Sequence, residues 1–245
     1  EWAPELFARL GATVVPLYCT PDGSFPNHPA DPTKKKNLLD LQTVVLEEQA
    51  DLGVAFDGDG DRVGIVLPTG KMLWGDELIS ILAQDLLRWK TSSVVCDVKC
   101  SLSLHDIVQQ MGSKTIVSPT GYPNIQQRMQ LHGAILGGEQ SSHICIRDQY
   151  YCYDDGLFAA AKLAHLGARL LEYENNIPRY PCTPEIRIPL SVEQRSLIQA
   201  TPLPQLHDCR RTTLDGVRFD DEQGWMLFRL SGTENQAILR VEART

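Results

Sequence analysis

Short apolar segments alternate with helical segments over the middle of the chain. Each apolar segment is four or five residues long and ends near polar or glycine residues, as is typical of a buried strand. The expected strands are 52–56, 63–67, 93–97, 115–118 and 134–138, and the expected helices are 75–90, 101–111 and 122–131. Helices that alternate with strands along a chain indicate an α/β class, so we predict open, largely parallel sheets.

The N-terminal part of the chain extends this pattern. We expect a helix over 2–10, a buried strand over 13–18 and a solvated loop over 19–37 with three consecutive lysines. Asn37 is expected to cap a helix that continues to residue 50. The expected buried side of this helix consists of Leu38, Leu41, Val45 and Leu46.

The pattern changes near residue 180. A long amphipathic helix is expected after Asp155, and Pro181 and Pro184 then mark a linker. The remainder is rich in strands, expected at 185–190, 217–220, 225–229 and 237–243, with one helix near 192–200. We therefore predict a smaller, separate α+β domain at the C-terminus.

The composition limits the kinds of partner that we expect. The 245 residues include 31 acidic and 23 basic side chains, which give a net charge of −8, and 42% of the residues are hydrophobic. The apolar fraction supports a folded core, and the acidic balance argues against binding to nucleic acid or to an anionic membrane. No apolar run approaches the about 18 residues of a membrane-spanning helix. The seven cysteines form no CxxC pair, so we expect neither a cysteine zinc site nor a disulfide framework, and a cytoplasmic location.

The beginning of the chain suggests a longer protein. A strand normally precedes the first helix of an α/β layer, and none precedes the helix expected over 2–10. The chain also starts without an initiator methionine or a signal peptide. We therefore expect the sequence to be a fragment.

The acidic turn 57–62, Asp-Gly-Asp-Gly-Asp-Arg, carries the strongest chemical signal. Asp57, Asp59 and Asp61 alternate with glycines at the end of an expected strand. Carboxylate oxygens in a tight turn suit Mg²⁺, with a phosphate oxygen from outside completing the coordination. The planar fork of Arg62 suits a phosphoryl group. Three like charges this close together repel one another unless a cation is present, which argues against a purely solvated turn.

Two other kinds of acidic turn have related sequences. An EF-hand requires Gly at the sixth loop position and Glu at the twelfth, where this chain has Arg62 and Pro68, so it is excluded. Phosphatases of the haloacid dehalogenase type also place Asp-x-Asp-Gly after a strand and use the first Asp as nucleophile. They usually have Thr or Val at the position of Asp61, and this alternative stays open.

On this turn, and over nearly its whole length, the chain resembles the α-D-phosphohexomutases, most closely the bacterial phosphomannomutase/phosphoglucomutase group. The resemblance implies open mixed sheets with helices on both faces. It also implies that 1–71 is the C-terminal part of domain 2 with the metal loop, 72–183 is domain 3 with a sugar-binding loop, and 184–245 is domain 4 with a phosphate-binding loop. Domain 1, which carries the phosphoserine of the family, has no counterpart here.

The resemblance also implies substrate-binding residues. The 138–143 loop, Gly-Glu-Gln-Ser-Ser-His, is similar to the Gly-Glu-Met-Ser-Gly-His of the family, which implies that Glu139, Ser141 and His143 contact the sugar. Gln140 looks more like the phosphoglucosamine mutases, whereas Tyr-Asp-Asp-Gly at 153–156 resembles the phosphomannomutase/phosphoglucomutase side.

The 229–235 loop is similar to the Arg-Pro-Ser-Gly-Thr-Glu-Pro of the family. The resemblance implies that four of its residues supply the phosphate-binding groups, namely Arg229, Ser231, Gly232 and Thr233. It also implies catalytic roles for Arg62 and Lys99. Tyr122 stands where the family has a histidine, and a phenol does not titrate near neutral pH as a histidine does.

The resemblance implies an enzyme that interconverts hexose 1-phosphate and hexose 6-phosphate, with mannose or glucose as the sugar. Phosphate would move through a phosphoserine and a hexose 1,6-bisphosphate, with Mg²⁺ as cofactor. Without domain 1, the 245 residues alone are expected to be inactive. A phosphoglucosamine mutase and a non-catalytic relative that binds sugar phosphates remain the alternatives.

Overall fold

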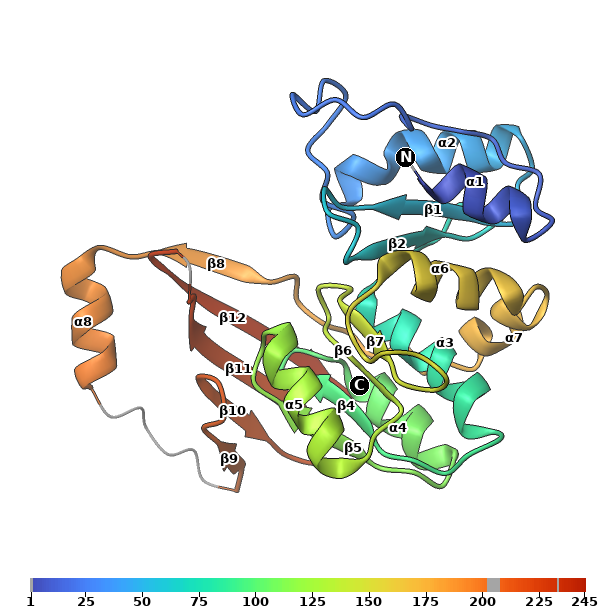
Figure 1. Ribbon diagram of the computed structural model, residues 1–245. Coiled ribbons are helices and arrows are strands. Elements are labelled where there is room, and N and C mark those ends of the chain that lie inside the picture. Colours follow the sequence, from blue (N-terminus) through green and yellow to red (C-terminus); the bar gives the residue numbers. More distant parts are fainter. Residues whose placement is uncertain (1, 202–207, 233) are drawn as a thin grey trace.

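Three sheets follow one another along the chain in the computed structural model, which describes residues 2–201, 208–232 and 234–245 (Figure 1). Their strand orders are β1-β2-β3, β5-β4-β6-β7 and β8-β12-β11-β10-β9. The first sheet and its helices lie above the second in Figure 1, and the third extends to the left. None of the described helices is long and apolar enough to cross a membrane.

The first sheet is antiparallel, and helices cover both of its faces. Its strands are β1 (Gly53–Phe56), β2 (Val63–Val66) and β3 (Met72–Leu73). One face packs on α2 (Leu39–Glu47) and the other on α6 (Gly156–His165). The expected parallel pairing is wrong here, because the short turn 57–62 joins β1 to β2 directly and parallel strands need a longer crossover.

The second sheet is mixed. Its strands are β4 (Val94–Asp97), β5 (Thr115–Ser118), β6 (Leu136–Gly138) and β7 (Ile144–Ile146). β4 pairs parallel with β5 and β6, whereas β7 returns antiparallel to β6. Helix α5 (Tyr122–His132) covers one face, and α3 (Gly75–Leu87) and α4 (Leu102–Gln110) cover the other. This is the predicted arrangement of open mixed sheets with helices on both faces.

The third sheet is antiparallel, and one short helix accompanies it among the described residues, as predicted for an α+β unit. Its strands are β8 (Ile186–Pro189), β9 (Arg210–Thr212), β10 (Val217–Asp220), β11 (Gly224–Leu230) and β12 (Gln236–Ala243). Helix α8 (Val192–Ala200) follows β8 and has no buried residue.

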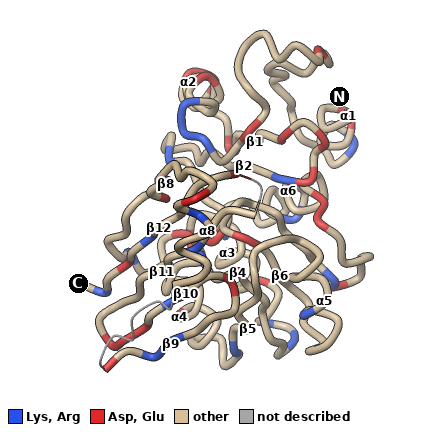
Figure 2. The backbone as a smooth tube through the Cα atoms, turned by 90° about the vertical axis from the view of Figure 1, so that its left-hand side faces the viewer, with Lys and Arg blue, Asp and Glu red and all other residues tan. Residues whose placement is uncertain are grey.

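The N-terminal region departs from three expectations. Helix α1 (Trp2–Arg9) forms as predicted, but 13–18 is an exposed segment and not a strand, because no described strand pairs with its backbone. Asn37 does not cap α2: it lies in a 3₁₀ turn (Lys35–Leu38), and its side chain donates to the carbonyl of Asp31. The lysine run 34–36 overlaps the start of this turn, is exposed, and forms a continuous basic stretch near α2 in Figure 2.

The long helix expected after Asp155 is two helices. Helix α6 ends at His165, and α7 (Arg169–Asn175) follows after a break. Gly167 has a φ of +54° within this break, a conformation that an α-helix cannot contain. The carboxylate of Asp155 caps the start of α6 by accepting a hydrogen bond from Phe158 N–H at 2.8 Å.

The main core joins the first two sheets. Val63 and Ile65 of β2 pack into the same buried cluster as Val94 and Cys96 of β4, and α3, α4 and α6 supply most of its remaining side chains. The third sheet packs against the second through Trp225 and other apolar side chains beside β4 and α4.

Buried polar contacts fix the position of the third sheet. Glu242, which is 2% exposed, accepts hydrogen bonds from the hydroxyl of Ser101 and the backbone N–H of Leu102 at the start of α4. Arg218 and Arg240 donate to the carbonyls of Val98 and Lys99, each at 2.7 Å. Because these directional bonds are shielded from water, they set how the 229–235 loop faces the second sheet.

Leu38 and Leu46 were both expected on the buried side of one helix, but Leu38 is 1% exposed and Leu46 is 51% exposed. We expect Leu38→Ala to lower the free energy of unfolding by about 2–5 kcal/mol, because it leaves a cavity. The same change at Leu46 should alter it by less than about 0.5 kcal/mol. Urea denaturation of the two variants checks this, and equal losses would contradict the packing described for α2.

Candidate functional site

The acidic turn follows β1 directly, and hydrogen bonds to the carboxylate of Asp57 hold its backbone in place. Oδ1 of Asp57 accepts hydrogen bonds from the backbone N–H groups of Gly60 and Arg62, both at 3.1 Å. Gly60 has a φ of +78°, which glycine adopts without strain. These contacts hold the three carboxylates of the turn close together.

One oxygen from each of Asp57, Asp59 and Asp61 lies within 4.8 Å of the other two. Burial alone would raise the pKa of Asp57, but its contacts with Asp61 and Arg62 outweigh this effect and lower it. Burial, together with the adjacent Asp57, raises the pKa of Asp61 to about 6. Oδ1 of Asp61 is buried and has no hydrogen-bond partner among the described residues. A divalent cation would satisfy this oxygen, so the residues fit a metal ion.

Arg62 lies among carboxylates from two segments. Its Nε is 2.6 Å from Oδ2 of Asp57 and 3.8 Å from Oδ1 of Asp61, and one terminal nitrogen is 3.4 Å from Oδ1 of Asp31. Asp31 comes from the long N-terminal loop, so that loop helps to orient the guanidinium. The positive charge also offsets part of the repulsion between the aspartates.

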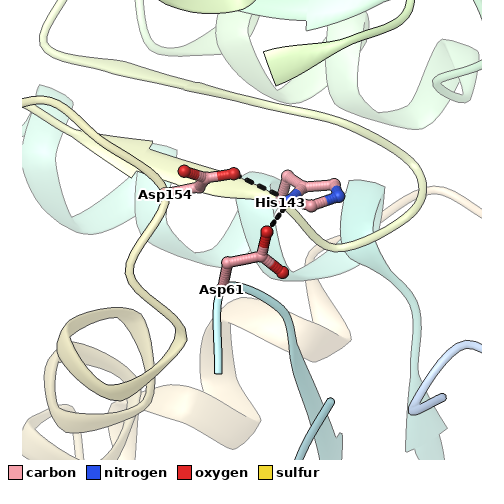
Figure 3. A group of neighbouring side chains, drawn as sticks. All are labelled: Asp61, His143 and Asp154. Atoms are coloured by element: carbon pink, nitrogen blue, oxygen red, sulfur yellow. Dashed lines mark hydrogen bonds and ion pairs between the residues drawn. The ribbon is translucent and has the colours of Figure 1, made fainter. Parts of the chain in front are cut away.

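His143 joins the 138–143 loop to the acidic turn (Figure 3). Its backbone forms an antiparallel bridge with Arg62. Its Nδ1 is 2.8 Å from Oδ2 of Asp154 and 3.4 Å from Oδ2 of Asp61. Burial opposes protonation of His143, but the hydrogen bond with Asp154 and the charge of Asp61 outweigh it and raise the pKa. The other ring nitrogen points away from both carboxylates in Figure 3.

Glu139 and Ser141 contact each other in the same loop. Glu139 is 3% exposed; one of its carboxylate oxygens accepts from the backbone N–H of Gly121, and the other accepts from the hydroxyl of Ser141 at 2.8 Å. The Glu139 backbone N–H donates to the carbonyl of His143 at 2.9 Å. The structure thus brings Glu139, Ser141 and His143 into one group with the acidic turn.

Lys99 lies just after β4 and is 6% exposed, so it is not a surface lysine. Its Nζ is 3.6 Å from Oδ2 of Asp97 and 3.9 Å from Oε1 of Glu185. Asp97 also accepts hydrogen bonds from the backbone N–H of Gln140 and the hydroxyl of Thr120. Through Asp97, Lys99 is connected to the 138–143 loop.

Arg229 reaches the second sheet through Asp215. Its Nε donates to Oδ1 of Asp215 at 3.2 Å, and Oδ2 of Asp215 accepts from the backbone N–H of Thr120 at 3.0 Å. Ser231 is buried, and its hydroxyl accepts from the backbone N–H of Glu234 at 3.1 Å. Gly232 is exposed. Thr233 lies outside the described residues.

Three carboxylates that connect these groups were missing from our predicted site: Asp97, Asp154 and Asp215. Asp97 ends a buried strand, a position where parallel sheets commonly place polar site residues, so that signal was present. Asp215 has no such signal, since it reaches the site only through packing of the third sheet.

Burial and the charge of Asp154 raise the pKa of Tyr122, so this phenol stays protonated at neutral pH.

Two models of one protein family match successive parts of the chain. A family model described as phosphoglucomutase/phosphomannomutase, alpha/beta/alpha domain II, matches residues 1–70, and the model of domain III of the same family matches 74–175. The chain belongs to the phosphoglucomutase/phosphomannomutase family. This membership confirms the resemblance seen in the sequence.

Two relatives within the family carry the name phosphomannomutase/phosphoglucomutase. The chain is 41% identical to a phosphomannomutase/phosphoglucomutase of Pseudomonas putida over 248 residues, 98% of this chain and 54% of the relative. It is 40% identical to that of Pseudomonas aeruginosa over 250 residues, 99% of this chain and 54% of the relative. It therefore spans about half the length of the curated relatives that it matches.

Two solved structures share the fold. A phosphoglucomutase/phosphomannomutase family protein of Burkholderia thailandensis superposes with a TM-score of 0.88 at 32% identity, over 99% of this chain and 53% of that one. An N-acetylphosphoglucosamine mutase of Aspergillus fumigatus, in complex with GlcNAc-6P and magnesium, has a TM-score of 0.56 at 16% identity, over 82% of this chain and 52% of that one. At that identity the likeness concerns the fold alone.

Gly75, the first residue of α3, packs directly against the backbone of the 138–143 loop. A Cβ atom on Gly75 would overlap the backbone carbonyl of Glu139 and would lie 2.7 Å from Gln140 O and Ser142 N. We expect Gly75→Ala to destabilise the chain by about 1–3 kcal/mol and to speed hydrogen exchange at the Ser142 amide, because backbone must move. Gly23→Ala is the matched control, since nothing lies within 4 Å of its Cβ position. Equal urea midpoints for both variants would contradict this close packing.

Proposed function

We propose that the protein interconverts hexose 1-phosphate and hexose 6-phosphate, and that this chain supplies three of the loops that do so. One observation carries the proposal: a continuous set of contacts links the acidic turn to the 138–143 and 229–235 loops. The contacts run from Asp61 to His143 and Glu139. They continue through the turn at Gly121 and Thr120 to Asp215 and Arg229.

The acidic turn is the proposed magnesium site, with Asp57, Asp59 and Asp61 as ligands. When bound, Mg²⁺ would neutralise charge on a transferring phosphoryl group. Asp57 and Asp31 orient the guanidinium of Arg62, the last residue of the turn, and there it would stabilise the same charge. Lys99 is the second proposed catalytic residue. It is buried, and its ammonium group lies beside Asp97 at the end of β4.

Glu139, Ser141 and His143 are proposed to bind the sugar, since they offer acceptors and donors suited to hydroxyl groups. The proposed phosphate site consists of Arg229, Ser231, Gly232 and Thr233, the last on sequence grounds alone. An arginine with neighbouring hydroxyl and backbone donors suits a dianion.

Mannose and glucose phosphates are the proposed substrates, because the relatives at 40–41% identity are named phosphomannomutase/phosphoglucomutase. A hexose 1,6-bisphosphate is the proposed intermediate. A mutase needs a phosphoryl donor, and we propose a phosphoserine on a domain with no counterpart in these residues. We also propose domain limits at 1–71, 72–183 and 184–245, and a cytoplasmic location.

Magnesium binding tests the metal part of this proposal. We expect Asp59→Asn to weaken Mg²⁺ binding by about tenfold, because one anionic ligand becomes neutral. Asp59 is exposed, so the fold should be unaffected. Isothermal titration of the variant beside the exposed Asp51→Asn as control measures the effect, and unchanged Mg²⁺ affinity would remove the acidic turn from the proposal.

Substrate binding tests the phosphate loop. We expect Arg229→Ala to weaken binding of glucose 1-phosphate and mannose 1-phosphate by about tenfold or more, since a charge-assisted hydrogen bond contributes about 1.5–3 kcal/mol. Arg211→Ala, an exposed position on β9 of the same sheet, is the control and should bind as before. Titration calorimetry on the 245-residue chain gives both values. Full affinity in Arg229→Ala would leave the 229–235 loop as a plain hairpin.

A further inference from the structure

Asp61, His143 and Asp154 form a second group of metal-binding donors, next to the acidic turn (Figure 3). One donor atom of each residue lies within 4.8 Å of the others. The three residues come from separate segments. Asp61 belongs to the acidic turn, His143 to the 138–143 loop, and Asp154 directly precedes the residue that caps α6. We propose that this group binds a transition-metal ion, Zn²⁺, and that bound Zn²⁺ opposes Mg²⁺ binding at the acidic turn.

The donor set selects the kind of ion. One imidazole nitrogen and two carboxylate oxygens suit Zn²⁺, whereas Mg²⁺ prefers oxygen ligands alone. Three protein ligands with a fourth position left for water or substrate are also the usual number in zinc sites that are open to the solvent. The acidic turn offers oxygen only, so the two neighbouring groups differ in the ion that they favour.

The distances come close to those that zinc requires. Zn–N and Zn–O bonds of about 2.0–2.2 Å place tetrahedral ligands about 3.3–3.5 Å apart. Nδ1 of His143 is already 3.4 Å from Oδ2 of Asp61. Oδ2 of Asp154 is 2.8 Å from Nδ1, so this pair would open by about half an ångström. The ion takes the place of the proton that Nδ1 and Asp154 share, and that proton goes to the solvent.

Backbone contacts hold the three ligands before any ion arrives. The Arg62–His143 bridge fixes the loop to the acidic turn, and a second bridge joins Cys145 to Asp154. The backbone N–H of Gly156 donates to the carbonyl of Gly60 at 3.0 Å, which ties the start of α6 to the same turn. Because the ligands are already close, binding costs little conformational entropy.

Asp61 belongs to both groups, and this makes the two ions antagonists. Its Oδ2 lies toward His143, while its Oδ1 is buried on the other edge of the carboxylate. Two divalent cations beside one carboxylate repel each other. By linkage, each ion then lowers the affinity for the other by the same factor. The antagonism rests on the proposed magnesium site, whereas zinc binding itself does not.

Calorimetric titration of Zn²⁺ and of Mg²⁺ into the 245-residue chain tests the proposal. We expect His143→Gln and Asp154→Asn each to weaken Zn²⁺ binding by about tenfold or more, with Mg²⁺ affinity changed by less than about twofold. Asp59→Asn should show the reverse pattern, because Asp59 belongs to the acidic turn alone. Saturating Mg²⁺ should also weaken Zn²⁺ binding to the unmodified chain.

Nitrogen NMR of the histidine side chains gives a readout that needs no variant to fold. Zn²⁺ should shift the Nδ1 resonance of His143 in the unmodified chain. Zinc affinity that survives His143→Gln, with imidazole resonances that do not move, would place Zn²⁺ away from His143 and overturn the proposal. Zinc binding to His143 without any Mg²⁺ binding would uphold the zinc site and remove the proposed magnesium site. Zinc affinity independent of Mg²⁺ would overturn the antagonism.

Discussion

The backbone bridge between Arg62 and His143 is the contact on which the site depends. It joins a turn of the first sheet to a loop of the second, so two groups of charged residues meet across a boundary between sheets. The carboxylates that gather there would repel one another. Arg62 and His143 lie among them and offset that repulsion, which explains why the pKa values of Asp57 and His143 move in opposite directions.

A second set of buried bonds brings the third sheet to the same place. The carboxylate of Glu242 accepts from the indole N–H of Trp225 at 2.7 Å and from the start of α4, where backbone N–H groups have no partner within the helix. Arg218 lies over the ring of Trp225, 4.2 Å from its centroid, and donates to the second sheet. Each group needs its partner because it is shielded from water. Arg229 therefore acts from a sheet held in one orientation.

Many patterns that depend on neighbouring residues were predicted, although the break at Gly167 was not. The strand expected at 115–118 is β5, and the acidic turn was recognised because its charges lie within one short segment. Features that depend on distant partners were missed. The segment 13–18 has the composition of a strand, but a strand forms only beside another one. His143 and Arg229 were singled out through resemblance, yet their contacts with the carboxylates of Asp154 and Asp215 could be found only from packing.

The core described for the first two sheets also bears on how the chain unfolds. Val63 and Ile65 belong to the same buried cluster as Val94, Cys96 and the inner side of α6. Although the family divides here into two domains, removal of either half would expose the apolar face of the other. We therefore expect residues 2–175 to lose their structure in one cooperative step.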